Sequence, residues 1–217
     1  MRRAMFWTGT VMVVAGLVLV GYFAWQFFGT NIVAKQNQEQ RIEELQELWA
    51  KTPDAPSAES GEVRLGNASA LIRIPRFGDD YVMPVLEGTS DGVLSQGYGH
   101  FTDTANPGEA GNYALAAHRI THGEPLRDMP ELEPGDEVLV ETREAVYTYV
   151  LDTNPEDLVV PFTAGWVLDE KPVNPDGGPS AEGKEIITLT TCSELFHTDD
   201  RMIAFGHLTS VEEKSTQ

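Results

Sequence analysis

Residues 5–28 form a long apolar run, and this run limits what the rest of the chain can fold into. It is interrupted only by glycine, threonine and Gln26, and it contains no charged side chain. At about 1.5 Å per residue, a helix of this length exceeds the ~30 Å hydrocarbon core of a bilayer. We therefore predict a membrane anchor within residues 1–30, which leaves room for one folded domain of about 150 residues.

The residues on either side of the run predict how the chain sits in the membrane. A cleaved signal peptide would have a shorter apolar segment of about 7–15 residues and a small-residue cleavage site, which we do not find. Arg2 and Arg3 precede the run, whereas the whole chain has a net charge of −19. The positive-inside rule predicts a cytoplasmic N-terminus and an extracellular remainder at the cell membrane. The acidic charge argues against nucleic acid as a partner.

Residues 31–62 are predicted to form a helical stalk followed by a linker. Ile42, Leu45, Leu48 and Trp49 recur at spacings of three and four residues, which is typical of an amphipathic helix. This apolar stripe could pack on the folded domain or lie at the membrane surface, and the pattern does not choose between them. From residue 52 to 62, prolines, small residues and acids predict a linker.

Residues 63–217 are predicted to form one all-β domain. Short apolar runs alternate with clusters of Pro, Gly, Asp and Asn, and residues 90–96 are the single short helical candidate. Such strands without long helices between them favour a closed or nearly closed β-barrel. A long loop at 161–183 is either a binding wall or an insertion without a role. The predicted strands are residues 70–74, 81–86, 112–117, 137–142, 146–152, 185–191 and 202–208.

Cys192 is the only cysteine of the chain, so it cannot form an intramolecular disulfide. Composition alone favours a small buried hydrophobe at such a position. Strand alternation, however, puts Ile187 and Leu189 on the core side and Cys192 on the opposite face, above Thr188 and Thr190. A thiol at a strand end above a threonine-lined groove is a good nucleophile site.

A catalytic thiol needs a base or a cation, because a free cysteine with a pKa of about 8.5 is mostly protonated at neutral pH. Among the five histidines, His118 is the best candidate, since it ends a strand of small residues that lets another chain approach. Arg201 begins the last strand and could stabilise an oxyanion. It could equally pair with Asp199 or Asp200, and spacing leaves both roles open.

Taken together, these residues resemble the sortase family. The Thr-Leu-x-Thr-Cys signature lies at residues 188–192, an Ala-Gly-His-Arg-like motif at 116–119, and the downstream arginine at Arg201. The chain is most similar to actinobacterial class E sortases, which share the N-terminal anchor and the sequences at 192–198 and 204–208. Ala117 replaces the usual glycine before the histidine. Phe101 replaces the tyrosine of a Gly-His-Tyr run, a position associated with substrate preference.

The resemblance implies an eight-stranded sortase-type β-barrel and a cysteine transpeptidase without metal or organic cofactor. Its substrates would be secreted proteins with a C-terminal Leu-(Pro/Ala)-x-Thr-Gly sorting signal. Cys192 would cleave between Thr and Gly through a thioester, which an amine of a peptidoglycan precursor or a pilin then captures. His118 would move protons and Arg201 would hold the oxyanion or the substrate backbone. The residues implied in signal binding are Phe101, Ala117, Thr190 and Thr191.

Three other functions compete with this interpretation. L,D-transpeptidases also use a cysteine thioester, but they carry a Ser-x-Gly-Cys sequence that differs from the sequence before Cys192. A pilin-polymerising sortase often has a second, C-terminal anchor, whereas the sequence after Leu208 is short and polar. An inactive adhesion or scaffold module would not need the cysteine, the histidine and the arginine together.

Overall fold

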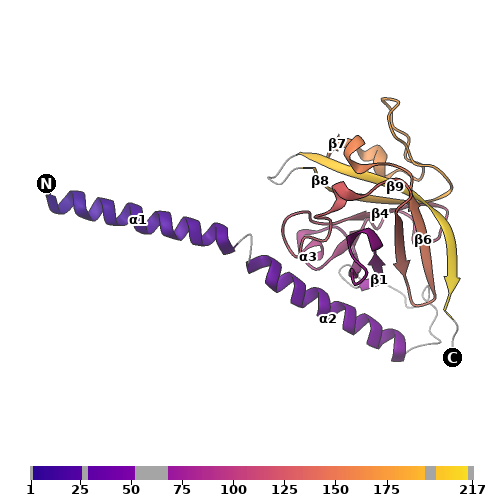
Figure 1. Ribbon diagram of the computed structural model, residues 1–217, viewed down its shortest axis with the longest axis horizontal. Helices are drawn as coiled ribbons and strands as arrows, with labels where there is room; N and C mark the ends of the chain where they lie inside the picture. Colours follow the sequence, from indigo (N-terminus) through magenta and orange to yellow (C-terminus); the bar gives the residue numbers. More distant parts are fainter. Residues whose placement is uncertain (1, 26–28, 52–67, 194–198, 215–217) are drawn as a thin grey trace.

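The computed structural model describes residues 2–25, 29–51, 68–193 and 199–214, and it consists of two helices followed by a β-barrel (Figure 1). Helix α1 (Arg2–Ala24) projects away from the barrel. Its segment Phe6–Phe23 is long and apolar enough to cross a membrane, and none of it is buried inside the protein. The structure is therefore compatible with the predicted single-pass anchor.

Eight strands close into a barrel, which confirms the predicted fold. Around the ring the order is β6-β5-β1-β2-β3-β4-β8-β9, and β9 pairs with β6 to close it. The pairs β2–β3 and β4–β8 are parallel, and the other pairs of the ring are antiparallel. The strands are β1 (Ala68–Arg73), β2 (Met83–Glu87), β3 (Tyr98–His100), β4 (Gly111–Ala116), β5 (Glu137–Glu141), β6 (Ala145–Leu151), β8 (Glu185–Cys192) and β9 (Asp200–Glu213).

A short strand outside the ring and a few short helices complete the domain. Strand β7 (Val159–Pro161) adds to the outer edge of β9. The predicted helical segment at 90–96 contains α3 (Asp91–Leu94). Two strands of the structure, β3 and β7, were not predicted, because three residues are too few to display strand alternation. The 3₁₀ helices are η2 (Pro75–Phe77), η3 (Met129–Glu131), η4 (Pro155–Asp157) and η5 (Gly165–Leu168).

The two faces of strand β8 belong to two different apolar clusters. Ile187 and Leu189 point into the barrel core, as strand alternation predicts. On the outer face, Ile186 packs with Phe205 of β9 and with Val167 of the loop between β7 and β8. Because apolar side chains on this outer face need cover from water, the loop forms a second layer over the barrel. This loop therefore has at least a packing role.

Helix α2 (Thr30–Lys51) packs on the barrel beside β1 and β2 (Figure 1). Its inner face includes Ala34, Gln38 and Leu45, which are all buried. The structure thus decides between the two surfaces left open by the sequence: the stalk packs on the folded domain. Leu48, which the sequence placed in the apolar stripe, is 55% exposed. The predicted linker at 52–62 and the domain boundary at 62/63 lie outside the described residues, so both stay predictions.

Candidate active site

Cys192 and Arg201 face each other across the β8–β9 pair. Their Cα atoms are register partners, the last pair before the two strands separate. In an antiparallel pair, side chains of directly opposed residues emerge on the same face with Cβ atoms about 4.5–5.5 Å apart. Cys192 is a free, partly buried cysteine. The Nη1 group of Arg201 donates to the carbonyl oxygen of Asp200 at 3.0 Å. The strand register therefore starts the Arg201 side chain on the same face of the sheet as the thiol.

Parallel pairing of β4 with β8 brings His118 to the same end of the barrel. The register ends with Ala116 opposite Thr190. Beyond this pair, the Ala117 amide donates to the Thr190 carbonyl at 3.2 Å, and the Thr191 hydroxyl donates to the Ala117 carbonyl at 2.8 Å. The residue after Ala117 is His118, and the residue after Thr191 is Cys192. His118, Cys192 and Arg201 thus lie where β4 and β8 end and β9 begins.

The ring of His118 lies against a second histidine. The rings of His118 and His122 are stacked, with centroids 4.7 Å apart and planes 28° apart. Burial is the main cause that lowers the pKa of His118 to about 4, the charge of His122 adds to it, and Asp91 opposes it. At neutral pH His118 is therefore uncharged, and it can accept a proton.

The remaining predicted site residues lie at two places. Thr190 and Thr191 are 7% and 3% exposed, and Ala117 belongs to the barrel core, next to the cysteine and the histidine. Phe101 lies farther along the barrel from the thiol. Its amide donates to the carbonyl oxygen of Ala114, and Ala114 is the register partner of Thr188 on β8. Four residues of strand separate Thr188 from Cys192, or about 13 Å. Contact of any of these residues with a substrate stays a prediction.

Phe101 lines an open pocket at the surface of the barrel. The pocket lies between the turn after β2, the loop after β3 and the loop between β7 and β8, whose Leu168 forms one wall. Among the described residues, no group of three or more His, Cys, Asp or Glu side chains could hold a metal ion.

Comparison with known proteins identifies the family. The Sortase domain family matches residues 72–209. Sortase SrtE1 of Streptomyces coelicolor is 36% identical over 216 residues, which cover 95% of this chain and 57% of that protein. Sortase E from Streptomyces avermitilis superposes with a TM-score of 0.60 at 40% identity, over 69% of this chain and 93% of that structure. This chain belongs to the sortase family.

A second solved structure supports the assignment of this chain to the sortase family. Sortase E1 from Streptomyces coelicolor, solved with a tripeptide in the active site, has a TM-score of 0.58 and 36% identity. It covers 68% of this chain and 91% of that one. The predicted similarity to class E sortases and the predicted enzyme class, a cysteine transpeptidase, are confirmed.

Arg119 lies near the candidate active site, and the sequence predicted no role for it. Its guanidinium donates to the carbonyl oxygen of Ser193, so it joins the residue after His118 to the residue after Cys192. Its Nε is buried and has no described hydrogen-bond partner. The Ala-Ala-His-Arg motif contains Arg119, but only the tertiary contact reveals that it connects the two segments.

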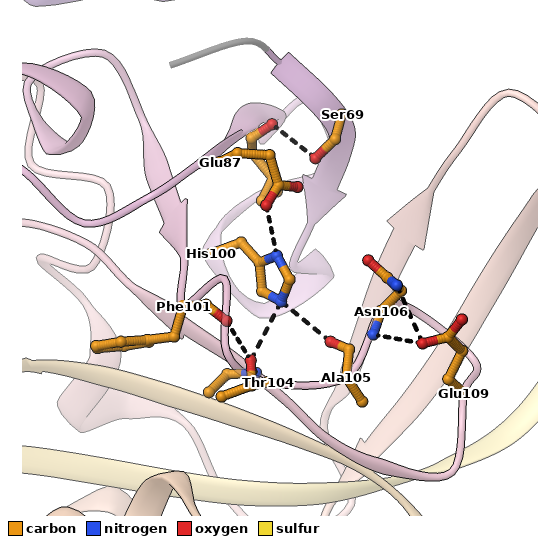
Figure 2. A network of polar contacts seen from close by, with 10 residues as sticks. Ser69, Glu87, His100, Phe101, Thr104, Ala105, Asn106 and Glu109 are labelled. Atoms are coloured by element: carbon orange, nitrogen blue, oxygen red, sulfur yellow. Dashed lines mark hydrogen bonds and ion pairs between the residues drawn. The ribbon is translucent and has the colours of Figure 1, made fainter. Parts of the chain in front are cut away.

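A buried polar network holds the loop that carries Phe101, and Figure 2 shows its members. His100 places Nδ1 2.8 Å from Glu87 Oε2, and its Nε2 lies 3.0 Å from the carbonyl oxygen of Ala105. Nε2 also lies 3.2 Å from the Thr104 hydroxyl, whose own hydrogen is donated to the Phe101 carbonyl. Nε2 must therefore carry a proton, and a second proton lies between His100 and Glu87.

Removing the Glu87 carboxylate should destabilise the fold strongly. We expect Glu87→Ala to lower the free energy of unfolding by about 3–5 kcal/mol, because it leaves buried His100 without its partner. Glu87→Gln should cost clearly less, since the amide can donate to Nδ1 of a neutral His100 while Nε2 keeps its bonds. Urea unfolding of the two variants measures the difference.

The control for this measurement is an exposed glutamate on another strand. Glu137→Ala, at the exposed start of β5, should change the free energy of unfolding by no more than about 0.5 kcal/mol. Equal losses in Glu87→Ala and Glu87→Gln would contradict the hydrogen bond to Nδ1 of His100 as the source of the stabilisation.

Proposed function

We propose that this sortase cleaves a C-terminal Leu-(Pro/Ala)-x-Thr-Gly sorting signal between Thr and Gly and transfers the protein to a cell-wall peptide amine. The observation that carries the proposal is the direct pairing of Cys192 with Arg201, at the strand ends where His118 also lies. A nucleophile, a base and a fixed cation at one point are the groups that acyl transfer requires.

The first half of the reaction forms the acyl-enzyme. Neutral His118 takes the thiol proton while Sγ of Cys192 attacks the threonine carbonyl carbon. The carbonyl oxygen becomes an oxyanion, which the Arg201 guanidinium stabilises. When this intermediate collapses, the carbon–nitrogen bond breaks, and the imidazolium of His118 gives its proton to the leaving glycine amine. A thioester on Cys192 remains.

The second half uses the same groups in reverse. An acceptor amine attacks the thioester carbonyl, Arg201 again stabilises the oxyanion, and His118 takes the proton that the amine loses. The carbon–sulfur bond then breaks, an amide is released, and the thiolate recovers the proton from His118. Neither half needs a metal or an organic cofactor.

The pH dependence should reflect the buried environment of His118. Because its pKa is lowered to about 4, His118 stays neutral down to mildly acidic pH. The rate of thioester formation should therefore be lost only as pH falls through about 4, where the base becomes protonated. An ordinary histidine, with a pKa of about 6.5, would lose activity near pH 6.5. Single-turnover rates between pH 3.5 and 8 measure this limb, and a loss near pH 6.5 would contradict the neutral base.

Location and recognition are parts of the same proposal. Arg2 and Arg3 before α1 support a cytoplasmic N-terminus, with the catalytic domain of residues 63–217 outside the membrane. Phe101, at the pocket beside the loop between β7 and β8, supports a contact with the sorting signal on that side. Ala117, Thr190 and Thr191 would shape the groove near the thiol.

A peptide assay tests the proposed function. The full chain in detergent micelles is incubated with Leu-Ala-x-Thr-Gly and Leu-Pro-x-Thr-Gly peptides, with either a cell-wall-type peptide amine or a lysine peptide as acceptor. Mass spectrometry should detect a thioester on Cys192 and an amide product with at least one peptide. Folded protein that gives neither adduct nor product with both peptides would exclude this function. The preferred acceptor separates cell-wall anchoring from pilin polymerisation.

A further inference from the structure

The stalk helix α2 is bonded directly to the loop that follows His118. Asn31 accepts a hydrogen bond from the Gly123 amide at 3.0 Å and donates to the Glu124 carboxylate at 2.9 Å. Gln38 is 2% exposed, and its amide donates to the carbonyl oxygen of His122 at 3.0 Å. Two side chains of the helix thus hold three successive residues of the loop, from 122 to 124.

These three loop residues have a backbone that the chain does not adopt readily by itself. The φ angles are 55° at His122, 83° at Gly123 and 55° at Glu124. In the part of the chain that the structure describes, no other non-glycine residue has a positive φ. Such a conformation costs about 1–3 kcal/mol for each non-glycine residue and persists only where surrounding contacts fix it. The bonds from α2 supply such contacts.

The packing between helix and loop is also close. A Cβ atom added at Gly123 would lie 2.6 Å from Oε1 and 2.7 Å from Nε2 of Gln38. The Gln38 amide therefore lies directly against the loop backbone, and the φ of 83° favours glycine at position 123. A loop held this tightly transmits the position of the helix to the residues it carries.

The loop that α2 binds, residues 122–124, contacts the proposed base His118 through one ring. His122 carries the ring that stacks on His118, with centroids 4.7 Å apart. Its carbonyl is the group that Gln38 binds. A continuous series of contacts thus runs from α2, through the backbone of His122, to the face of the His118 imidazole. Movement of the loop would both turn His118 and admit water to it.

We propose that α2 belongs to the catalytic apparatus, with Gln38 and Asn31 as positioning residues that hold His118 through the His122–Glu124 turn. The inference rests on the proposed function, in which His118 moves the proton. It implies that the helix next to the membrane anchor does more than space the barrel from the bilayer, because the base is fully ordered only while α2 is docked.

Single substitutions on α2 can test this role without removing the helix. Ala34 and Leu45 remain buried against the barrel, and Arg41 still donates to Gln96 at 2.9 Å. Gln38→Met keeps the length of the side chain and loses the donor, and Asn31→Ala loses both bonds to the loop. Gln36→Ala and Asn37→Ala are matched controls, because both residues are exposed on the same helix.

Two readouts on the full chain in detergent micelles distinguish positioning from general stability. Gln38→Met and Asn31→Ala should lower kcat for transpeptidation at least about tenfold, while KM for the peptide changes less than about twofold. In NMR with labelled histidine, the ring signal of His118 should titrate at higher pH than in the unaltered protein, because a looser loop admits water. The two control variants should change neither quantity.

Unchanged kcat and an unchanged His118 titration in both loop-contact variants would overturn the inference, as would equal effects in the control variants. If the unaltered protein forms no thioester, the proposed function fails. The NMR titration still decides whether α2 positions His118, because it needs no substrate.

Discussion

Cys192→Ala sortase should form no thioester and release no transpeptidation product with either sorting-signal peptide. We expect a loss of at least about 10⁴-fold in kcat, because without Sγ no covalent intermediate can form. No other thiol can replace it, since Cys192 is the only cysteine of the chain. The measurement is product formation by mass spectrometry over hours at high enzyme concentration.

The same variant should keep its fold and its affinity for the peptide. Cys192 is only partly buried at the end of β8, so removal of its sulfur leaves the barrel core intact. Urea unfolding and peptide binding by fluorescence anisotropy serve as controls. Measurable product from a folded Cys192→Ala variant would show that the attacking group is a different one.

Arg201→Lys should reduce kcat/KM for peptide cleavage by about 10²–10³-fold, the usual effect of losing an oxyanion donor. Lysine keeps the positive charge, but it loses the planar guanidinium that can direct two donors at once toward an oxygen. Because Arg201 is the register partner of Cys192, a shorter or displaced donor at this position misses the oxyanion that forms beside Sγ. Steady-state kinetics with the cleaved peptide provides the measurement.

A second arginine gives the control for the charge-conserving change. Arg76, in η2, pairs with Glu133 and Asp136 at the surface, at 3.2 and 2.9 Å. Exposed ion pairs contribute little to the stability of a fold. Arg76→Lys should therefore leave the structure intact and change kcat/KM by less than about twofold. Full activity in Arg201→Lys would refute the oxyanion role and favour pairing of Arg201 with an aspartate.

Seven of the eight barrel strands were predictable because each carries its own pattern. The alternation at residues 185–191 places Ile187 and Leu189 in the core, and the structure agrees. Strand β3 escaped prediction because its three residues are held by β2 and β4, which lie elsewhere in the sequence. A pattern read along one segment cannot report a partner strand that is distant in the chain.

The buried network around His100 shows a similar limit. Glu87 follows the apolar residues 84–86 on β2, and a carboxylate in such a place requires a buried partner. The sequence does not say which residue that partner is. The choice of His100 depends on the parallel pairing of β2 with β3, which sets Glu87 opposite His100.

The sequence by itself determined the apolar run at residues 5–28 and the strand alternation, and it predicted the set of Cys192, His118 and Arg201, because these signals are local or belong to short motifs. Only the tertiary structure decided that α2 packs on the barrel rather than at a membrane surface. It also decided that Arg201 lies opposite Cys192 and that His118 is stacked on His122. These features depend on burial and register between segments far apart in the chain, and neither is encoded in one segment alone.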